Sequence, residues 1–207
     1  TAKAGFSVSV YNRSSNVSEK WVKKFGGKNF SEPSELAETC DVVFICVGRD
    51  EDVLEVTSGK NGIFHTIKPG SLIVDHSTTS ANLSRELGAI ANQLNCNFID
   101  APVSGGEKGA IDGKLAIMCG GSSESFNLAK SIMECYATKI SLMGPHGSGQ
   151  LCKMVNQICI AGLLQGLSEG VNFAKNAGLD VEQVIEIISK GAAQSWQLDN
   201  RAVTMYQ

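Results

Sequence analysis

The sequence predicts an α/β protein in which a doubly wound parallel sheet is followed by the start of an all-helical domain. Short β-type runs alternate with helix-type segments over the first 140 or so residues, and beyond that the β-type runs stop. Alternation of this kind is typical of parallel strands joined by crossover helices. With 43% hydrophobic and 19% charged residues, the composition is that of an ordinary globular protein with a buried core.

Six short segments have the composition of strands. Each is rich in apolar or β-branched residues and is bounded by turn-forming residues. They cover residues 7–11, 42–47, 72–75, 97–100, 115–119 and 139–143.

The segments between these runs have helical composition, and we expect helices at residues 19–25, 34–40, 51–57, 80–94 and 124–136. Ser80 is a candidate N-cap for the fourth of them. Helices in these positions would cover both faces of one parallel sheet.

The rest of the chain is predicted to be helical. Residues 149–177 contain no proline and are rich in Leu, Ile, Val and Ala, and residues 181–189 and 195–201 also have helical composition. We therefore expect an α/β domain in residues 1–146 and a helical domain that begins in residues 147–207.

Charge and composition argue against several classes of protein. The chain has 18 basic and 21 acidic residues, which gives no excess of positive charge for nucleic acid or an anionic membrane. No apolar run approaches the roughly 18 residues of a membrane span. The three histidines are far apart and no two cysteines have metal-knuckle spacing, so we expect no metal site. Seven cysteines, several inside apolar runs, favour buried thiols in a reducing cytoplasm.

The first candidate site follows the first strand. Residues 7–11 lead into Asn12, Arg13 and Ser14, with no carboxylate among them. In a dinucleotide-binding unit an acidic residue here selects NAD, whereas an Arg accommodates the 2′-phosphate of NADP. The alternative is an ordinary strand-to-helix turn with a solvated arginine.

The second candidate is the sequence from Asp100 to Gly106, directly after a strand. Ser104, Gly105 and Gly106 leave three adjacent backbone N–H groups unshielded, a nest that suits a carboxylate. A loop that only reverses the chain is the competing interpretation.

The third candidate lies on the long helix. Lys153 and Asn156 are three residues apart, so they share one face, one turn beyond Gly149. A solvated polar stripe is the ordinary explanation of such a pair. The neighbours are apolar, however, and we expect this helix to be buried nearly all round, where a lysine requires a partner or a function.

Together these segments resemble the β-hydroxyacid dehydrogenase family, which includes 3-hydroxyisobutyrate dehydrogenase, tartronate semialdehyde reductase and glyoxylate/succinic semialdehyde reductase. Residues 100–106 (DAPVSGG) are similar to the substrate-binding signature of the family, and residues 147–157 (GSGQLCKMVNQ) are similar to its catalytic helix. The resemblance extends over essentially the whole chain. It implies a Rossmann-like, NADP-binding domain in residues 1–146 and the start of a substrate and dimerisation domain in residues 147–207.

The resemblance also implies roles for individual residues. Lys153 would be the catalytic residue, Asn156 its neighbour at the substrate, and Ser104 to Gly106 the carboxylate site. The set implied to bind the cofactor consists of Asn12, Arg13, Ser14, Val47, Gly48 and Thr78. These residues favour NADP over NAD, with a small carboxylate as substrate and hydride transfer to or from its hydroxyl-bearing carbon as the reaction.

The sequence departs from the family pattern in two ways, and three other kinds of protein are alternative interpretations. The first strand and glycine-rich loop of the family, and its C-terminal helices, have no counterpart in the sequence, so we expect a fragment. Asp52 stands where relatives carry an Asn. A non-catalytic nucleotide-binding or scaffold protein and an imine reductase are disfavoured by Lys153, and 6-phosphogluconate dehydrogenase by the lack of a phosphosugar site. The long apolar helix predicts a homo-oligomer.

Overall fold

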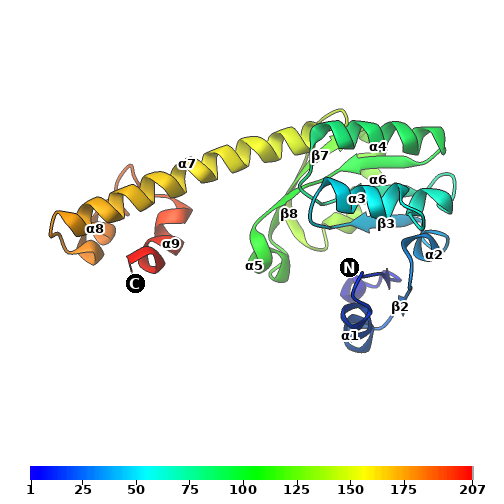
Figure 1. Ribbon diagram of the computed structural model, residues 1–207, viewed down its shortest axis with the longest axis horizontal. Helices are drawn as coiled ribbons and strands as arrows, with labels where there is room; N and C mark the ends of the chain where they lie inside the picture. Colours follow the sequence, from blue (N-terminus) through cyan, green and yellow to red (C-terminus); the bar gives the residue numbers. More distant parts are fainter. Residues whose placement is uncertain (207) are drawn as a thin grey trace. The chain divides into compact units, whose positions relative to one another are not determined.

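The computed structural model describes residues 1–206, and the chain divides into two compact units. The first, Thr1–Lys153, contains all the strands, and the second starts at Met154 and is helical. The predicted fold class, a doubly wound α/β sheet followed by helices, is confirmed (Figure 1).

The main sheet has six strands in the order β3-β4-β5-β7-β6, with β8 on β7. The strands are β3 (Val42–Ile45), β4 (Leu72–Asp75), β5 (Asn97–Asp100), β6 (Val103–Ser104), β7 (Leu115–Gly121) and β8 (Ala137–Gly144). The first three are parallel and in register, so that Ile45, Asp75 and Asp100 lie side by side at their carboxyl ends. This alignment places the loops after the three strands along one edge of the sheet.

One pairing was not expected, because β7 runs antiparallel to β5 and to β6. The connection between β5 and β7 covers residues 101–114 and holds β6 and the six-residue helix α5 (Gly106–Ile111), none of whose residues is buried. Parallel strands are usually joined by a crossover helix that packs on the sheet. Here the connection instead forms β6, which pairs antiparallel with β7.

Helices cover both faces of the sheet. On one face, α2 (Pro33–Ala37), α3 (Asp50–Ser58) and α4 (Ala81–Gln93) pack on the inward residues of β3 and β4, such as Val43 and Ile73. On the other face, α6 (Ser123–Met133) packs on Leu72, Val74, Ile99 and Ile117. Successive residues of β4 therefore belong to opposite cores, which explains why that strand is apolar throughout.

The N-terminal segment forms a small element of its own. It consists of η1 (Ala2–Ala4), β1 (Ser9–Val10), α1 (Ser15–Phe25) and β2 (Lys28–Asn29). Within residues 1–206, β1 and β2 pair in parallel only with each other. The predicted strand at residues 7–11 is thus present but shorter than expected.

The second unit continues the long helix α7 (Ser148–Asn176) into α8 (Val181–Ile188) and α9 (Trp196–Tyr206). These bounds agree with the predicted helical segments. Gly178, with φ of 73°, ends α7, and the carboxylate of Asp180 caps α8 by accepting from the N–H of Gln183 at 3.1 Å.

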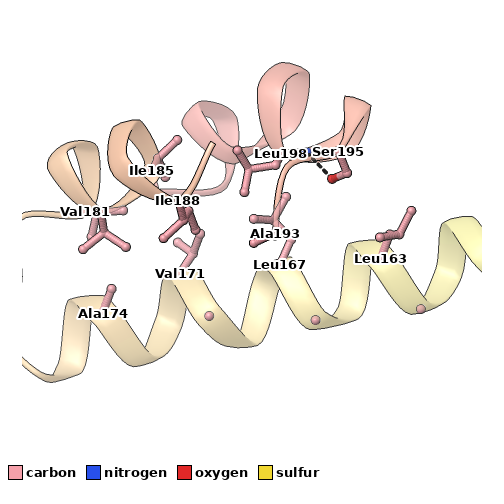
Figure 2. A pocket seen from close by; sticks show the side chains of 14 residues that line it. Leu163, Leu167, Val171, Ala174, Val181, Ile185, Ile188, Ala193, Ser195 and Leu198 are labelled. Carbon is pink, nitrogen blue, oxygen red and sulfur yellow. Dashed lines mark hydrogen bonds between the residues drawn. The ribbon is translucent and has the colours of Figure 1, made fainter. Parts of the chain in front are cut away.

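An apolar pocket of about 360 Å³ lies within this unit. Figure 2 shows Leu167, Val171 and Ala174 of α7 facing Ile185 and Ile188 of α8. Apolar side chains of α7, α8 and α9 line this pocket together.

One expectation about α7 is wrong: the helix is not buried nearly all round. Val155 is 61% exposed, Ile158 is 72% exposed and Phe173 is 71% exposed. Within residues 1–206, α8 and α9 cover only one side of the helix, and the apolar residues of the other side face outward. None of the helices described in residues 1–206 is long and apolar enough to cross a membrane.

Candidate active site

The candidate site is built on the carboxyl ends of β3, β4 and β5. In open α/β sheets, ligands bind outside the carboxyl ends of the parallel strands. Here the chain leaves β3 through Cys46–Arg49, leaves β4 through His76–Ser80 and leaves β5 through Ala101–Pro102. All the candidate cofactor residues except Asn12, Arg13 and Ser14 lie in the first two of these loops.

A buried carboxylate anchors the long helix to this edge. Asp100, the last residue of β5, accepts the N–H of Gly147 at 2.7 Å and the N–H of Gln150 at 3.0 Å. These two N–H groups belong to the amino end of α7, where backbone donors lack helical partners and the helix dipole is positive. Asp100 thus caps a helix that lies 47 residues further along the chain.

Two glycines make this close contact sterically feasible. A Cβ on Gly120 of β7 would lie 2.5 Å and 2.7 Å from the carboxylate oxygens of Asp100. A Cβ on Gly149 would lie 2.7 Å from Asp100 Oδ2 and would collide with the carbonyl oxygen of Met118. Any larger residue at either position would push α7 away from the sheet.

Gln150 makes the second attachment of α7. Its side chain is fully buried, its Nε2 donates to the carbonyl of Ser77 at 2.8 Å, and its Oε1 accepts the N–H of Thr79 at 3.1 Å. The hydroxyl of Ser77 in turn accepts the N–H of Val47 at 2.9 Å. The loops after β3 and β4 and the first turn of α7 therefore form one hydrogen-bonded unit.

Lys153 lies one turn further along α7. Its Nζ donates to the carbonyl of Val103 at 2.8 Å, and partial burial lowers the pKa of the amine below its ordinary 10.5. Val103 is followed directly by Ser104, so this bond brings the lysine to the start of the Ser-Gly-Gly segment. The fold has thus joined two segments about 50 residues apart that sequence analysis singled out separately.

The two glycines of the Ser-Gly-Gly segment have positive φ angles. Ser104 ends β6, where it pairs with Ala116 of β7. Gly105 and Gly106 follow with φ of 129° and 62°, which are conformations that favour glycine. Consecutive N–H groups in such a turn can converge on one anion.

Asn156 follows Lys153 by three residues on α7, as expected for one helix face. Its side-chain amide donates to Gln157 at 3.0 Å rather than to the lysine. The structure therefore places Asn156 on the helix that bears the lysine without a direct bond between the two side chains.

The loop residues proposed for the cofactor are at least partly accessible, and Thr78 is accessible between two buried neighbours. Gly48 and Thr78 are exposed and Val47 is half-buried, while Ser77 and Thr79 on either side of Thr78 are buried. A Cβ on Gly48 would lie 2.8 Å from a carboxylate oxygen of Asp52. The edge therefore offers exposed backbone and one hydroxyl on a rigid base, which fits an extended nucleotide.

The turn after β1 carries the exposed side chain of Arg13. Asn12 Oδ1 accepts the N–H of Ser14 at 2.9 Å, which leaves Arg13 90% exposed at the tip. Arg13 Nη1 lies 3.7 Å from Asp52 Oδ1, and Arg49 lies 4.0 Å from the other oxygen of the same carboxylate. Two guanidinium groups thus gather around one aspartate beside the loop after β3.

The histidines have structural partners. His65 contacts the carbonyl of Gly59 at 2.9 Å, His146 that of Phe98 at 3.0 Å, and His76 that of Ala101 at 2.6 Å. The second ring nitrogen of His76 lies 2.8 Å from the hydroxyl of Tyr136, and burial lowers the pKa of this histidine.

Sequence analysis assigned no role to four residues that hold the site together: Asp75, Ser77, Asp100 and Gln150. The sequence did indicate the two aspartates, because two consecutive predicted strands each end in an aspartate. In the parallel register Asp75 and Asp100 are direct neighbours, and both are fully buried. Burial raises the pKa of Asp75 to about 6, and its Oδ2 has no hydrogen-bond partner within residues 1–206. Adjacent buried carboxyls of this kind are rare outside functional sites.

Comparison with known proteins adds the family to this geometry. Residues 1–144 match the model of the NAD-binding domain of 6-phosphogluconate dehydrogenase, and residues 147–206 match the model described as NAD-binding of NADP-dependent 3-hydroxyisobutyrate dehydrogenase. An uncharacterised oxidoreductase of Shewanella frigidimarina is 51% identical over 99% of the chain. The chain belongs to the β-hydroxyacid dehydrogenase family.

Further members of the family agree with this assignment. A probable mitochondrial 3-hydroxyisobutyrate dehydrogenase-like protein of Arabidopsis thaliana is 42% identical over 93% of the chain. The structure of the 3-hydroxyisobutyrate dehydrogenase of Mycobacterium tuberculosis with L-serine has a TM-score of 0.87 and 27% identity over 97% of the chain. The chain spans 70% of the length of the Shewanella relative, 64% of the Arabidopsis relative and 67% of the M. tuberculosis chain. These matches support a nicotinamide cofactor and oxidoreductase activity in general.

The raised pKa of Asp75 predicts a pH-dependent stability difference between the protein and its Asp75→Asn variant. A folded-state pKa of about 6, above the ordinary 3.8, means that the folded protein holds this proton more tightly than the unfolded chain. Stability from Asp75 is therefore present below about pH 4 and is lost as the pH rises to 6. Asparagine keeps the acceptor for Ser77 and cannot ionise.

We expect the variant to gain stability relative to the original between pH 4 and 6.5, by on the order of 3 kcal/mol, with a constant difference above pH 7. Urea unfolding followed by circular dichroism at each pH measures this gain. Asp112→Asn, at an exposed aspartate, is the control and should show no such trend. If the difference in the free energy of unfolding between Asp75→Asn and the original protein does not change with pH, the raised pKa of Asp75 is contradicted.

Proposed function

We propose that this protein is an NADP-linked dehydrogenase of small 3-hydroxy acids, or a reductase of the matching semialdehydes, similar to 3-hydroxyisobutyrate dehydrogenase. The observation that supports this most is the bond from Lys153 Nζ to the carbonyl of Val103, next to Ser104. It brings a proton-transfer group to a segment suited to a carboxylate. A 3-hydroxy acid presents its hydroxyl and its carboxylate at a short, fixed separation, which matches two such groups.

Lys153 would act on the substrate hydroxyl. In oxidation the neutral amine takes the hydroxyl proton, and in reduction the ammonium returns it to the developing alkoxide. Partial burial lowers the pKa of Lys153, which brings the neutral form closer to physiological pH. The carbonyl of Val103 holds the amine in place between turnovers.

The other residues would position the substrate. The N–H groups of the Ser104–Gly106 segment and the Ser104 hydroxyl bind the carboxylate, which sets the distance of the hydroxyl-bearing carbon from Lys153. Asn156, one turn beyond the lysine, donates its amide to the substrate hydroxyl after exchanging its bond to Gln157. Neither the carboxylate site at Ser104–Gly106 nor the contact made by Asn156 requires a charged side chain other than that of Lys153.

NADP, when bound, supplies the hydride acceptor or donor. We propose that Val47, Gly48 and Thr78 contact it along the carboxyl ends of β3 and β4, and that Asn12, Arg13 and Ser14 meet the 2′-phosphate. The absence of a carboxylate from residues 11–15 and the exposed guanidinium of Arg13 favour NADP over NAD. Residues 1–146 would then be the cofactor domain, and residues 147–207 the start of the substrate and dimerisation domain.

The expected cytoplasmic location remains a prediction, since the Arabidopsis relative is named as mitochondrial.

We also propose a homo-oligomer, at least a dimer. Along α7, the exposed apolar side chains include Val155, Ile158, Leu163 and Phe173, each 47% to 72% exposed. Apolar surface on this scale commonly marks an interface. Multi-angle light scattering at micromolar concentration should give at least twice the mass of one chain, and Ile158→Lys should shift the population to monomer. A stable monomer of the unmodified protein would refute the proposal.

Lys153→Ala should lower the turnover of the full-length enzyme about 10²- to 10⁴-fold, the usual contribution of general acid–base catalysis, with little change in NADPH binding. The assay follows NADPH oxidation with glyoxylate, succinic semialdehyde, tartronate semialdehyde and methylmalonate semialdehyde. In the oxidation direction the rate should rise with pH and level off below pH 10.5 as Lys153 loses its proton, and the variant should lack this rise.

Lys153→Arg should do little better than alanine, because a guanidinium cannot be deprotonated. Lys175→Ala, at an exposed lysine on the same helix, should retain full turnover. If Lys153→Ala stays folded, binds NADPH and keeps more than about a tenth of the turnover, the protein is a scaffold or uses another acid.

Arg13→Ala should weaken NADPH binding about 10- to 100-fold and leave NADH binding nearly unchanged, because only NADPH offers a 2′-phosphate to the guanidinium. The fold-change corresponds to losing one charge-assisted hydrogen bond, about 1.5–3 kcal/mol. Fluorescence titration of both cofactors measures it, with Lys20→Ala on α1 as the charge-matched control. An equal loss for both cofactors would remove Arg13 from the phosphate site.

A further inference from the structure

Gln150 is an unusual residue at the start of α7 because its long polar side chain is completely buried. Both ends of the amide are used, and both partners are backbone groups of one loop: the carbonyl of Ser77 at 2.8 Å and the N–H of Thr79 at 3.1 Å. Its own N–H goes to Asp100. A buried amide satisfied in this way resists displacement, because each broken bond leaves an unpaired polar group away from water.

The position of this side chain links two parts of the proposed site. Gln150 precedes Lys153 by three residues, so the two side chains lie one turn apart on the same side of α7. The two backbone groups that Gln150 holds lie on either side of Thr78. Ser77 also accepts the N–H of Val47. A single amide therefore connects the loops proposed to contact the cofactor with the turn that carries the lysine.

This link matters because few contacts fix the side chain of Lys153 in place. The lysine side chain has four rotatable bonds and a single hydrogen bond, to Val103. Its base on α7 therefore decides where the amine lies relative to the cofactor loops. Displacements of about 1 Å are enough to reduce turnover about 10²-fold when two reacting groups must be held in line.

We propose that Gln150 is a positioning residue that sets Lys153 in register with the cofactor loops by clamping the Ser77–Thr79 backbone to the first turn of α7. This inference rests on the proposed function for its catalytic consequence. Gln150 touches neither the substrate nor the reacting atoms, and it acts through the loop and the helix.

Two substitutions of Gln150 test its bonds to Ser77 and Thr79, and a third substitution, at Thr57, is the control. Gln150→Leu removes both bonds and leaves the carbonyl of Ser77 and the N–H of Thr79 without the side-chain partner that Gln150 supplies. Gln150→Glu keeps the acceptor for Thr79 but, when ionised, sets a carboxylate oxygen against the carbonyl of Ser77. When protonated, the same glutamic acid can donate to Ser77 and accept from Thr79, which restores the original pattern. Thr57→Val is a control that removes one buried bond, from Thr57 Oγ1 to the carbonyl of Val53 at 2.7 Å, within α3.

The first experiment measures kcat, the KM for the semialdehyde and the Kd of NADPH in the full-length enzyme. Gln150→Leu should lower kcat about 10- to 100-fold and change the Kd of NADPH less than about 3-fold. Gln150→Glu should show a similar loss at pH 8 and recover about tenfold relative to the original protein as the pH falls to 5.5. Thr57→Val should retain kcat. A Gln150→Leu enzyme within about threefold of the original kcat, or a Gln150→Glu deficit that ignores pH, would overturn the proposal.

A second measurement does not depend on catalysis and also covers a Gln150→Leu variant that folds poorly, since it can be made on Gln150→Glu. The rate of acylation of Lys153 by acetic anhydride, followed by peptide mass spectrometry over a range of pH, reports the pKa of the amine. In Gln150→Glu at high pH this pKa should move back towards 10.5, because the amine leaves its partly buried position. An unchanged labelling profile would argue against positioning, even if no hydroxy acid or semialdehyde proves to be a substrate.

Discussion

The whole site depends on one interaction, the capping of α7 by the carboxylate of Asp100. This residue ends a central strand of the sheet, and the N–H groups that it accepts lie at the start of a 29-residue helix. Because the carboxylate faces the positive end of the helix dipole, the contact both satisfies backbone donors and anchors the first turn of the helix. Gln150 and Lys153 lie within the first two turns of α7, so their positions follow from this one contact.

The arrangement has a cost in stability. Asp75 and Asp100 stand side by side at the edge of the sheet, and burial raises the pKa of both. Hydrogen bonds from Gly147 and Gln150 offset part of the penalty at Asp100. Asp75 retains one oxygen without a partner within residues 1–206. A burial cost at the carboxyl end of a sheet is common where a fold positions reactive groups, since an apolar edge would be more stable but could not hold the loops.

The proposed catalytic groups lie on elements of different rigidity. Lys153 stands on a regular helix and Val103 on a strand paired with β7, whereas Gly105 and Gly106 lie in a turn that only glycine adopts easily. Arg13, by contrast, is 90% exposed on a short turn. The proposed function would thus place the chemistry that needs a fixed geometry on the sheet and α7, and the recognition of a charged phosphate at the surface.

The sequence alone determined the fold class, the three short motifs and most of the element positions. Strands such as β4 and β5 were located to the residue, because short apolar runs bounded by turn residues have few other stable conformations. Local pattern also singled out Lys153, Asn156 and the Ser104–Gly106 segment. It did not predict that β7 runs antiparallel to β5 and β6, or that one side of α7 is exposed, since both depend on which elements pack together.

Only the tertiary structure decided which of these residues meet. The bond between Lys153 and Val103 joins positions 50 residues apart, and that between Gln150 and Ser77 joins positions 73 residues apart. A side-chain amide, a helix cap and two glycines without room for a Cβ are ordinary residues in the sequence. They acquire their roles because parallel strands bring their carboxyl ends to one edge, where distant backbone groups must find partners or remain buried and unpaired.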